Sequence, residues 1–378
     1  MQVTSFVGVI RAAEGFQIEV LPKVGKAIGC GEIEARQLLI EMLRCLGGFR
    51  HIQTDNAKLL ATKMPLMEVF IAEFLRAVGH VVKRGMRCDY VDCQDNLFTL
   101  RGKLQFAQHL RQNLCLADRF FTIHDEFSTN RPENRLLHSA LRCVLTFTAS
   151  QANQQLAREL RFAFSNVPES EQIAQDFQRI RLDRGMDQYA DALAWARLIL
   201  NEASPLTGSG NHHAPSLLFP MEAVFEAYVA KHLARQLAKN FTLKTQARSH
   251  TMVRHQGQNW FRLKPDLLIR VAPKDLLVLD TKWKLLDGSK SNGTDKYGLA
   301  QTDFYQLHAY GQTYLNGQGD VVLIYPKTDA FSNPLPVFEF PKSEGLRLWV
   351  LPFCLRERKL MLPSCGNLDA SFHAAVSE

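Results

Sequence analysis

Two short apolar segments in the second half of the chain constrain its fold more than any other feature. Residues 262–271 and 276–283 are rich in Leu, Ile and Val, and few residues separate them. This length and composition predict buried strands, and the short link at 272–274 allows the two to form a hairpin. The two segments nevertheless contain Asp266, Asp280 and Lys282. Charged groups in buried strands cost free energy unless they are paired or bind an ion, so these residues need a compensating role.

The elements predicted around this strand pair follow the order helix, three strands, helix, strand. The predicted helices are 220–238 and 298–315, and the predicted strands are 241–247, 262–271, 276–283 and 321–325, with further strands near 337–340 and 345–351. This order is typical of an α/β domain built on a mixed sheet.

The first half of the chain predicts a separate α+β domain. Its predicted strands are 5–10, 15–21 and 120–127, with a strand, turn and strand over 89–100 whose turn is 94–96, and its predicted helices are 32–46, 67–82, 104–112, 135–148 and 151–164. A polar stretch follows at 165–172, and 378 residues suit two domains, so we predict domains 1–168 and 169–378. The stretch 204–216 is rich in Ser, Gly, Asn and Pro and predicts a flexible loop.

Composition excludes several classes of protein. Hydrophobic residues make up 46% and charged residues 22%, which is typical of a globular chain. No apolar run approaches the ~20 residues that cross a bilayer, and no secretory signal is visible. The eight cysteines form no Cys-x-x-Cys pair. We therefore expect a reduced, cytoplasmic protein that does not enter a membrane.

The charged residues of the strand pair favour a metal site. Asp280 and Lys282 are two apart on a strand and project from one face, and a hairpin can bring Asp266 beside Asp280. Neighbouring carboxylates repel unless a cation neutralises them, and hard oxygen ligands suit Mg²⁺, with Mn²⁺ as a substitute. The carbonyl of Thr281 can add a ligand, and Lys282 can orient or deprotonate an attacking water or stabilise charge on a phosphate. The alternative is a surface ion pair of Asp280 with Lys282 or Lys284.

The two flanking helices add polar side chains near this strand pair. Glu222 and Glu226 lie one turn apart on the first helix, and a carboxylate there can reach the metal. On the second helix Asp303, Gln306 and Tyr310 share one stripe and can support the lysine or contact phosphate. The alternative for this stripe is a solvated helix face, which we favour for Asp303.

Basic residues concentrate around the same strands. Residues 231–300 hold 14 Lys and Arg against 5 Asp and Glu, a net charge of +9, whereas the whole chain carries +7. Such a patch attracts a polyanion such as DNA through Lys and Arg that pair with phosphates. The alternative is a solvated face without a special role.

In this order, these residues resemble the PD-(D/E)xK nuclease superfamily, whose members share an αβββαβ core and cleave DNA with Mg²⁺. The resemblance implies a restriction-endonuclease-like fold for residues 169–378, and it allows Asp in place of Glu before x-Lys. The catalytic set that it implies is Glu226, Asp266, Asp280 and Lys282. It places the metal on Asp266, Asp280 and Glu226, with Glu226 preferred to Glu222, and it assigns Gln306 and Tyr310 to the auxiliary motif.

A narrower resemblance covers nearly the whole chain. The segments IEVLPKVGK, FTLRGKLQFAQHLRQN, PMEAVFEAYV, LKPDLLI, LDTKWK and DFYQLHAYGQ are similar, in the same order, to the McrC family, the nuclease subunits of McrBC 5-methylcytosine restriction systems. The resemblance implies a hexameric McrB-like AAA+ GTPase partner and double-stranded methylated DNA as substrate. It also implies that the N-terminal domain binds the motor and stimulates its GTPase activity.

The sequence is consistent with a motor on another chain. The Gly-Lys pairs at 25–26 and 102–103 lack both the preceding Gly and the following hydroxyl of a phosphate-binding loop, so we expect no nucleotide on this chain. Arg101, Lys103, Arg111 and Arg135 form a basic group in the N-terminal domain that can contact the motor or DNA. The alternative is ordinary surface charge with internal salt bridges.

The sequence therefore predicts a Mg²⁺-dependent DNA endonuclease subunit that acts together with a GTP-driven motor in phage defence. Two alternatives remain at this point. One is an assembly and GTPase-activating module whose nuclease site is unused, and the other is a stand-alone PD-(D/E)xK nuclease.

Overall fold

The computed structural model divides the chain into two compact units. It describes residues 5–11, 16–23, 31–46, 65–116, 118–200, 216–237, 240–247, 249–271 and 273–363. Unit 1 comprises residues 1–10, 17–61 and 218–378, and unit 2 comprises residues 11–16 and 62–217. The loop predicted at 204–216 lies outside the described residues except for Ser216, as does most of the turn between the first two predicted strands.

The predicted boundary at 168/169 does not coincide with this division. Residues 165–172 lie inside unit 2, where they connect two helices. Val167 is buried, and the backbone N–H of Ser170 donates to Ser139 Oγ at 2.8 Å. A polar stretch that packs in this way is a connection within a unit, and a sequence pattern does not distinguish it from a linker.

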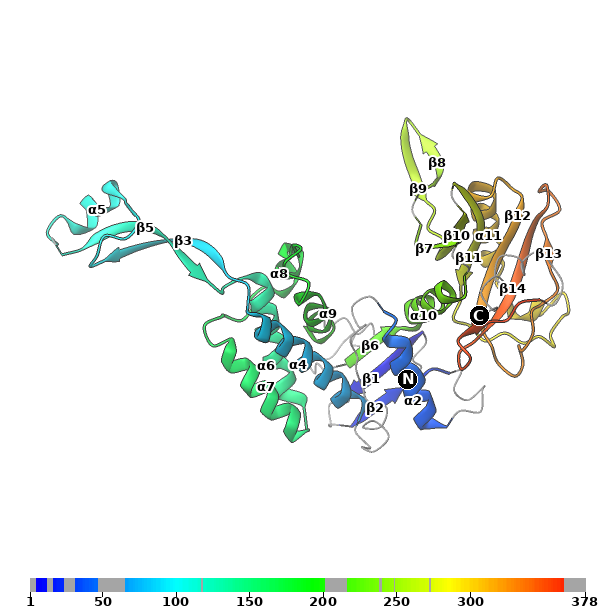
Figure 1. Cartoon of the computed structure of the whole chain (residues 1–378), viewed down its shortest axis with the longest axis horizontal. Helices are drawn as coiled ribbons and strands as arrows, with labels where there is room; N and C mark the ends of the chain where they lie inside the picture. The colour runs from blue at the N-terminus through cyan, green and yellow to red at the C-terminus, as the bar shows by residue number, and fades with distance from the viewer. Residues whose placement is uncertain are drawn as a thin grey trace. The chain divides into compact units, whose positions relative to one another are not determined.

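A mixed sheet is the centre of unit 1 (Figure 1), and its strands lie in the order β13-β14-β12-β11-β10-β7. The strands are β7 (Thr242–Thr245), β10 (Leu267–Val271), β11 (Lys274–Thr281), β12 (Gly319–Pro326), β13 (Phe338–Glu339) and β14 (Leu346–Cys354), and β15 (Lys359–Leu360) pairs with β14. Strands β7 and β11 both run antiparallel to β10, which lies between them, whereas β11, β12 and β14 run parallel. The predicted hairpin of two apolar strands is thus confirmed.

Two helices cover opposite faces of this sheet. Side chains of α11 (Gln301–Tyr314) share a core with Leu268, Val278 and Leu323. On the other face the Phe225 ring of α10 (Met221–Gln236) lies 5.2 Å from the Trp283 ring and 6.4 Å from the Phe353 ring. Because neighbouring residues of a strand point to opposite faces, this arrangement fixes which side chains of β10 and β11 face each helix.

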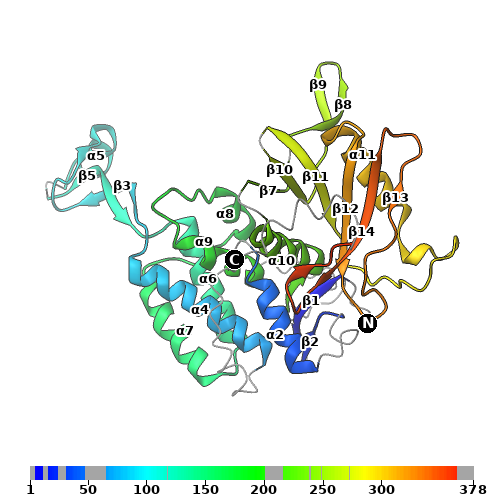
Figure 2. The ribbon, with the colours of Figure 1, turned by 45° about the vertical axis from the view of Figure 1, so that its right-hand side comes forward.

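The segment predicted as one strand over 262–271 is divided in the structure. Strand β9 (Gln258–Arg262) pairs with β8 (Thr251–His255) in a separate two-stranded hairpin, and β10 starts only at Leu267. In Figures 1 and 2 this hairpin projects from the sheet of unit 1. Both of its strands are exposed almost throughout, so no burial pattern in the sequence marks it.

The first residues of the chain form a smaller sheet. It has the order β2-β1-β6 and consists of β1 (Phe6–Arg11), β2 (Gln17–Val20) and β6 (Ser216–Pro220). Helix α2 (Glu32–Leu43) packs against α10, and two ion pairs, Glu34–Arg356 at 3.0 Å and Glu41–Arg358 at 2.9 Å, link α2 to the turn after β14.

Unit 2 is a bundle of helices held at one joint by a buried carboxylate. Its helices are α4 (Leu66–Arg84), α6 (Pro132–Phe147), α7 (Gln151–Ala163), α8 (Ile173–Arg179) and α9 (Tyr189–Leu200). Glu68 of α4 accepts hydrogen bonds from Thr148 Oγ1 at 2.7 Å, from the Ala149 N–H at 2.6 Å and from Asn153 Nδ2 at 2.8 Å. These bonds satisfy donors where α6 ends and α7 begins, so a single side chain joins three helices.

An arm extends from these helices (Figures 1 and 2). It consists of β3 (Asp89–Leu97), β4 (Lys103–Leu104), α5 (Phe106–Asn113) and β5 (Phe120–Ser128). The predicted turn at 94–96 is wrong, because β3 pairs with β5 in one continuous register from Asp89 to Leu97. Turn-forming residues are tolerated there because most of β3 is exposed.

Among the described residues, no helix is long and apolar enough to cross a membrane.

A buried histidine should make unit 1 less stable at acid pH. His232 of α10 lies 4.5 Å from the Tyr228 ring. Burial, and then Arg358, Arg235 and Lys231, lower the pKa of His232 from 6.5 to about 4. Between pH 6.5 and about pH 4, the histidine is protonated in the unfolded chain but remains neutral in the folded chain. The contribution of His232 to stability therefore falls as the pH drops toward 4, by about 2 kcal/mol between pH 7 and 5, and the difference between the wild-type chain and a variant without this histidine isolates it.

Urea unfolding of the full chain at pH 7 and pH 5 measures this loss. The His232→Gln variant removes the titrating group and should lose less stability between the two pH values than the unchanged chain. An equal loss in both proteins would contradict the assignment.

Candidate active site

The antiparallel pairing of β10 with β11 places the two predicted acidic residues side by side. Leu267 pairs with Leu279, so Asp266 and Asp280 occupy the next position of the same register. Asp266 lies just before β10 and Asp280 is the penultimate residue of β11. Both share the face of Leu268 and Val278, which α11 covers. The predicted convergence of the two carboxylates on one face therefore agrees with the strand register.

Asp280 is a buried carboxylate. Its residue is 1% exposed, and Lys282 Nζ lies 2.7 Å from its Oδ2 atom. The ammonium lies outside hydrogen-bond geometry, and within the described part of the chain this oxygen accepts no directed hydrogen bond. Burial, followed by the charge of Asp266, raises the pKa of Asp280 to about 7, although Lys282 opposes the shift. The charge on Asp280 is thus paired but incompletely compensated.

Asp266 is held by the end of the neighbouring strand. Its Oδ2 atom accepts hydrogen bonds from the backbone N–H and from the hydroxyl of Thr281, both at 2.8 Å. Thr281 is itself buried. These two bonds fix the Asp266 carboxylate beside the strand that carries Asp280.

Lys282 connects the strand end to α11. Its backbone N–H donates to Ile324 O at 2.9 Å, although β11 itself ends at Thr281. Its Nζ donates to Gln306 Oε1 at 3.1 Å and lies 4.0 Å from Asp303 Oδ1. Burial disfavours the ammonium, but Asp280 and then Asp303 outweigh this effect and raise the pKa of Lys282.

The two predicted auxiliary residues extend this network back to the strand entry. Gln306 Nε2 donates to the Tyr310 hydroxyl at 2.8 Å, and this hydroxyl donates to Lys264 O at 3.1 Å. The chain of bonds therefore fixes the residues directly before Asp266 as well as the head of Lys282. A shift of α11 would displace both.

Asp303 is not the solvated residue that the sequence favours. Its side chain is 15% exposed, and its Oδ2 atom accepts a hydrogen bond from the Tyr325 hydroxyl at 3.1 Å. Tyr325 lies on β12, and its own sequence context carries no sign of this contact. The position of Asp303, one turn from Gln306 on the same stripe, was the available signal.

Glu226 approaches Asp266 from α10. Gln246 Nε2 donates to Glu226 Oε1 at 3.1 Å, and the Gln246 N–H donates to Asp266 O at 2.7 Å. Burial, and then the charge of Asp266, raises the pKa of Glu226. Glu222, one turn earlier, is exposed. The structure thus brings Glu226 into the electrostatic surroundings of Asp266.

The donor set fits a hard divalent cation that keeps part of its water shell. No cluster of three or more His, Cys, Asp or Glu side chains in the described ranges holds a metal by itself. Two carboxylates, one with a buried oxygen that accepts no directed hydrogen bond, match Mg²⁺, which binds through one or two carboxylates and substrate phosphates.

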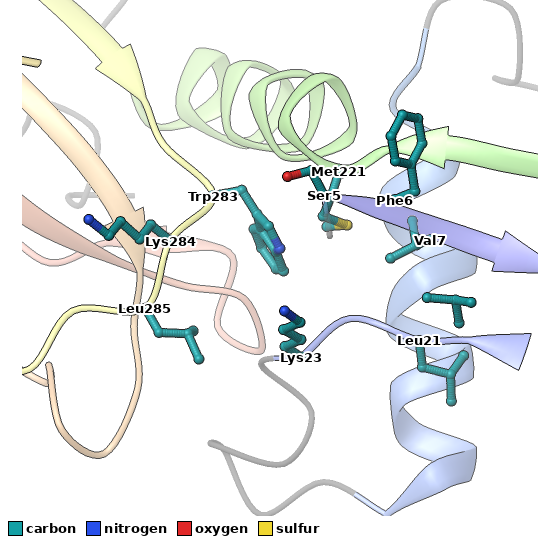
Figure 3. A pocket seen from close by; sticks show the side chains of 10 residues that line it. Ser5, Phe6, Val7, Leu21, Lys23, Met221, Trp283, Lys284 and Leu285 are labelled. Atoms are coloured by element: carbon teal, nitrogen blue, oxygen red, sulfur yellow. The ribbon is translucent and has the colours of Figure 1, made fainter. Parts of the chain in front are cut away.

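Two hollows of unit 1 border these elements. One, of about 610 Å³, is lined by Glu226 and Gln246 together with the cations Arg44 and Lys231. The other, of about 260 Å³, is shown in Figure 3. Trp283 points into it, away from the Asp280 face, and Lys23 and Lys284 lie at its sides. Only the first hollow opens at a predicted site residue.

The four basic residues predicted as a group in the N-terminal domain are separated. Arg101, Lys103 and Arg111 are exposed on the arm of unit 2. Arg135 lies on α6 and forms an ion pair with Asp176 at 2.7 Å, which raises the pKa of Arg135 chiefly through this hydrogen bond. The alternative of an internal salt bridge thus holds for Arg135.

Comparison with known structures gives the class of protein. The fold matches a chain of the assembly of Thermococcus gammatolerans McrB AAA+ hexamers with bound McrC, with a TM-score of 0.63 and 20% identity over 99% of this chain and 82% of that chain. A second structure, the McrBC complex of the same organism, matches with a TM-score of 0.50 and 24% identity over 63% and 68% of the two chains. The chain is a mixed α+β protein with a McrC-like fold.

Sequence comparison gives the family. Residues 1–326 match the model of the McrBC 5-methylcytosine restriction system component, and the chain belongs to this family. It is also 20% identical over 265 residues to the type IV methyl-directed restriction enzyme EcoKMcrBC of Escherichia coli K12. This match covers 67% of this chain and 75% of that protein. The predicted family is thus confirmed.

The ion pair of Asp280 and Lys282 should appear as an energetic coupling. Lys282→Met leaves a buried carboxylate beside Asp266 and should destabilise the chain by about 1–3 kcal/mol. Asp280→Asn should remove most of this penalty, so the double variant should be more stable than the two single effects predict. Urea unfolding without divalent ions measures the cycle, and additivity within about 0.5 kcal/mol would contradict the pairing.

Proposed function

We propose that the chain is the Mg²⁺-dependent DNA endonuclease subunit of a modification-dependent restriction system. In this proposal it cleaves phosphodiesters of methylated double-stranded DNA together with a GTP-driven AAA+ motor. The observation that carries the proposal is the meeting of Asp266, Asp280 and Lys282 at the ends of β10 and β11. Membership of the McrBC family supports it independently.

The order of elements supports a restriction-endonuclease-like domain. Helix α10, strands β7, β10 and β11, helix α11 and strand β12 follow one another as in the αβββαβ core of the PD-(D/E)xK superfamily, with the β8–β9 hairpin inserted. By this order of elements, Asp266 and Asp280 would correspond to the metal ligands of that superfamily.

Each residue has a role that its contacts support. Asp266 and Asp280 would hold Mg²⁺, with Glu226 as a further carboxylate near Asp266, and Mn²⁺ would substitute. The ion would neutralise charge on the phosphate oxygens and activate water. Lys282 would orient or deprotonate the attacking water or stabilise charge on the phosphate. Gln306 would hold the lysine at this position, because its Oε1 atom accepts the hydrogen bond from Lys282 Nζ. Tyr310 would support Gln306, and its hydroxyl is anchored by the bond to Lys264 O.

The arm of unit 2 is the surface that we propose for the motor. Arg101, Lys103 and Arg111 are exposed on it, and so are Phe106 and Leu114. Contiguous exposed apolar side chains mark interaction surfaces in proteins of this size. The structurally similar chain comes from an assembly of McrB hexamers with bound McrC, which supports a hexameric AAA+ partner for this chain also.

Loss of either metal carboxylate should abolish cleavage. In the complex with the cognate motor, Asp280→Ala and Asp266→Asn should each reduce Mg²⁺-dependent cutting of methylated plasmid by at least about 1000-fold. EDTA should do the same. Assembly and stimulation of GTP hydrolysis should be unchanged, because neither residue lies on the arm.

Glu222→Gln is the matched control, since Glu222 is an exposed carboxylate one turn from Glu226. This variant should cut normally. Cutting by Asp280→Ala at the normal rate would remove the assignment, and cutting by the purified chain without any motor would favour a stand-alone nuclease.

The arm should govern stimulation of the motor. The triple variant Arg101→Ala, Lys103→Ala, Arg111→Ala should require at least about 10-fold more protein to stimulate GTP hydrolysis, because charged rim contacts affect association strongly. Removal of three exposed cations from helices, Arg84→Ala, Arg158→Ala, Arg161→Ala, is the control. Unchanged stimulation by the arm variant, or GTP turnover by the isolated chain, would contradict this division of labour.

A further inference from the structure

The β8–β9 hairpin is an exposed element with no function in the site described above. Thr251 pairs with Arg262, Val253 with Trp260 and His255 with Gln258. Its loop is Gln256-Gly257, and both residues have positive φ, 46° and 81°. Two positive φ angles define the tight turn whose twist matches that of paired strands. The hairpin is thus a regular ribbon, yet both of its faces are solvated.

The side chains on this ribbon are of an unusual kind for a solvated surface. Met252, Trp260 and Phe261 are 60%, 45% and 71% exposed. The Trp260 and His255 rings lie 4.7 Å apart, which holds the indole in place. Phe261 has φ 55°, a conformation that bulky residues rarely adopt and that costs free energy. A strained, exposed aromatic beside a supported indole indicates a contact surface.

The positive charge of the segment that contains the hairpin indicates what kind of partner it binds. Residues 241–265 contain five Lys and Arg and no Asp or Glu. Among the described residues, neither Arg254 nor Arg262 has an acidic partner in an ion pair, and both are exposed. Cations without anions, interleaved with aromatic rings, match a polyanion that also offers apolar surface on its sugars and in its major groove, which is duplex DNA.

The base of the hairpin is fixed next to the candidate active site. The Leu263 N–H donates to His250 O at 3.0 Å, and the His250 ring packs edge-on against Tyr314 of α11 at 4.7 Å. Asp266 follows Arg262 by only four positions in the sequence, a reach of at most about 14 Å. This reach corresponds to about four nucleotide steps along one DNA strand.

We propose that the β8–β9 hairpin is a DNA-docking ribbon that holds duplex DNA beside the cleavage site. Arg254 and Arg262 contact phosphates, while Trp260 and Phe261 contact bases or sugars in the groove. A two-stranded ribbon fits the major groove, which is about 12 Å wide. The inference rests on the proposed nuclease function, since the cleavage site gives the ribbon its purpose, but binding can be measured separately from cutting.

Binding of a short fluorescent, unmodified DNA duplex to the purified full chain in EDTA tests the proposal. Arg254→Ala, Arg262→Ala should weaken binding about 10-fold at about 0.1 M salt and lower the slope of log affinity against log salt by about 2. Trp260→Ala, Phe261→Ala should weaken binding about 10-fold and leave the slope unchanged, because apolar contacts in the groove release no counterions.

Matched controls lie on α7 of unit 2. Arg158→Ala, Arg161→Ala removes two exposed cations, and Phe162→Ala removes an aromatic side chain that is 81% exposed. These variants should bind DNA normally. All variants should show the thermal unfolding of the unchanged chain, which excludes misfolding as the cause of weaker binding.

Three outcomes would overturn the proposal. They are equal DNA affinity of the hairpin variants and the unchanged chain, no DNA binding by the unchanged chain, and loss of motor binding with DNA affinity intact. Asp280→Ala separates this proposal from the nuclease assignment, since it should bind DNA normally but not cut. If the wild-type complex does not cut DNA while the hairpin variants lose DNA affinity, the nuclease function is refuted and the DNA-docking role of the hairpin is supported.

Discussion

The burial of one carboxylate, Asp280, beside the ammonium of Lys282 determines how the rest of the candidate site is built. A charge at 1% exposure is stable only if its surroundings compensate for the lost water. Lys282 does so in part, and Gln306 and Tyr310 in turn hold the lysine and the strand entry at Lys264. The sheet, the helix and the polar groups are therefore parts of one arrangement, and a change in any of them is felt by the acidic pair.

Much of this arrangement follows from the sequence because its signal is local. Charges inside two apolar strands stand out in a window of twenty residues, and period-two alternation assigns them to one face. Local patterns do not show which residues far apart in the sequence contact one another. Asp303 of α11 accepts a hydrogen bond from Tyr325 of β12, and β3 continues through a turn-like triplet because β5 pairs with it. The β8–β9 hairpin could not be predicted from the sequence for a different reason. Both of its faces are exposed to solvent, so its strands show no alternation of apolar and polar residues.

The two proposals assign chemistry and substrate binding to adjacent parts of one unit. In these proposals the acidic pair would hold the metal, and the basic hairpin would supply affinity for the duplex within a few nucleotides of it. Affinity from phosphate contacts is independent of sequence. The phosphate contacts of the ribbon therefore give no selectivity for modified bases, and in these proposals that selection would come from the motor. The exposed arm of unit 2, with its own cations, is then available for that partner.

The discontinuity of unit 1 has a consequence for biosynthesis. Strands β1 and β2 and helix α2 leave the ribosome early, but β6 and α10, which complete their sheet and cover it, follow only after all of unit 2 has been translated. The hydrogen bond from Met221 N–H to Ser5 O, 2.8 Å long, joins the two ends of this interval. Until then the apolar face of the nascent amino-terminal segment stays uncovered, whereas unit 2 can fold as soon as it has been translated. The acidic centre is thus assembled only after unit 2 has been translated, and a product that ends within unit 2 lacks it entirely.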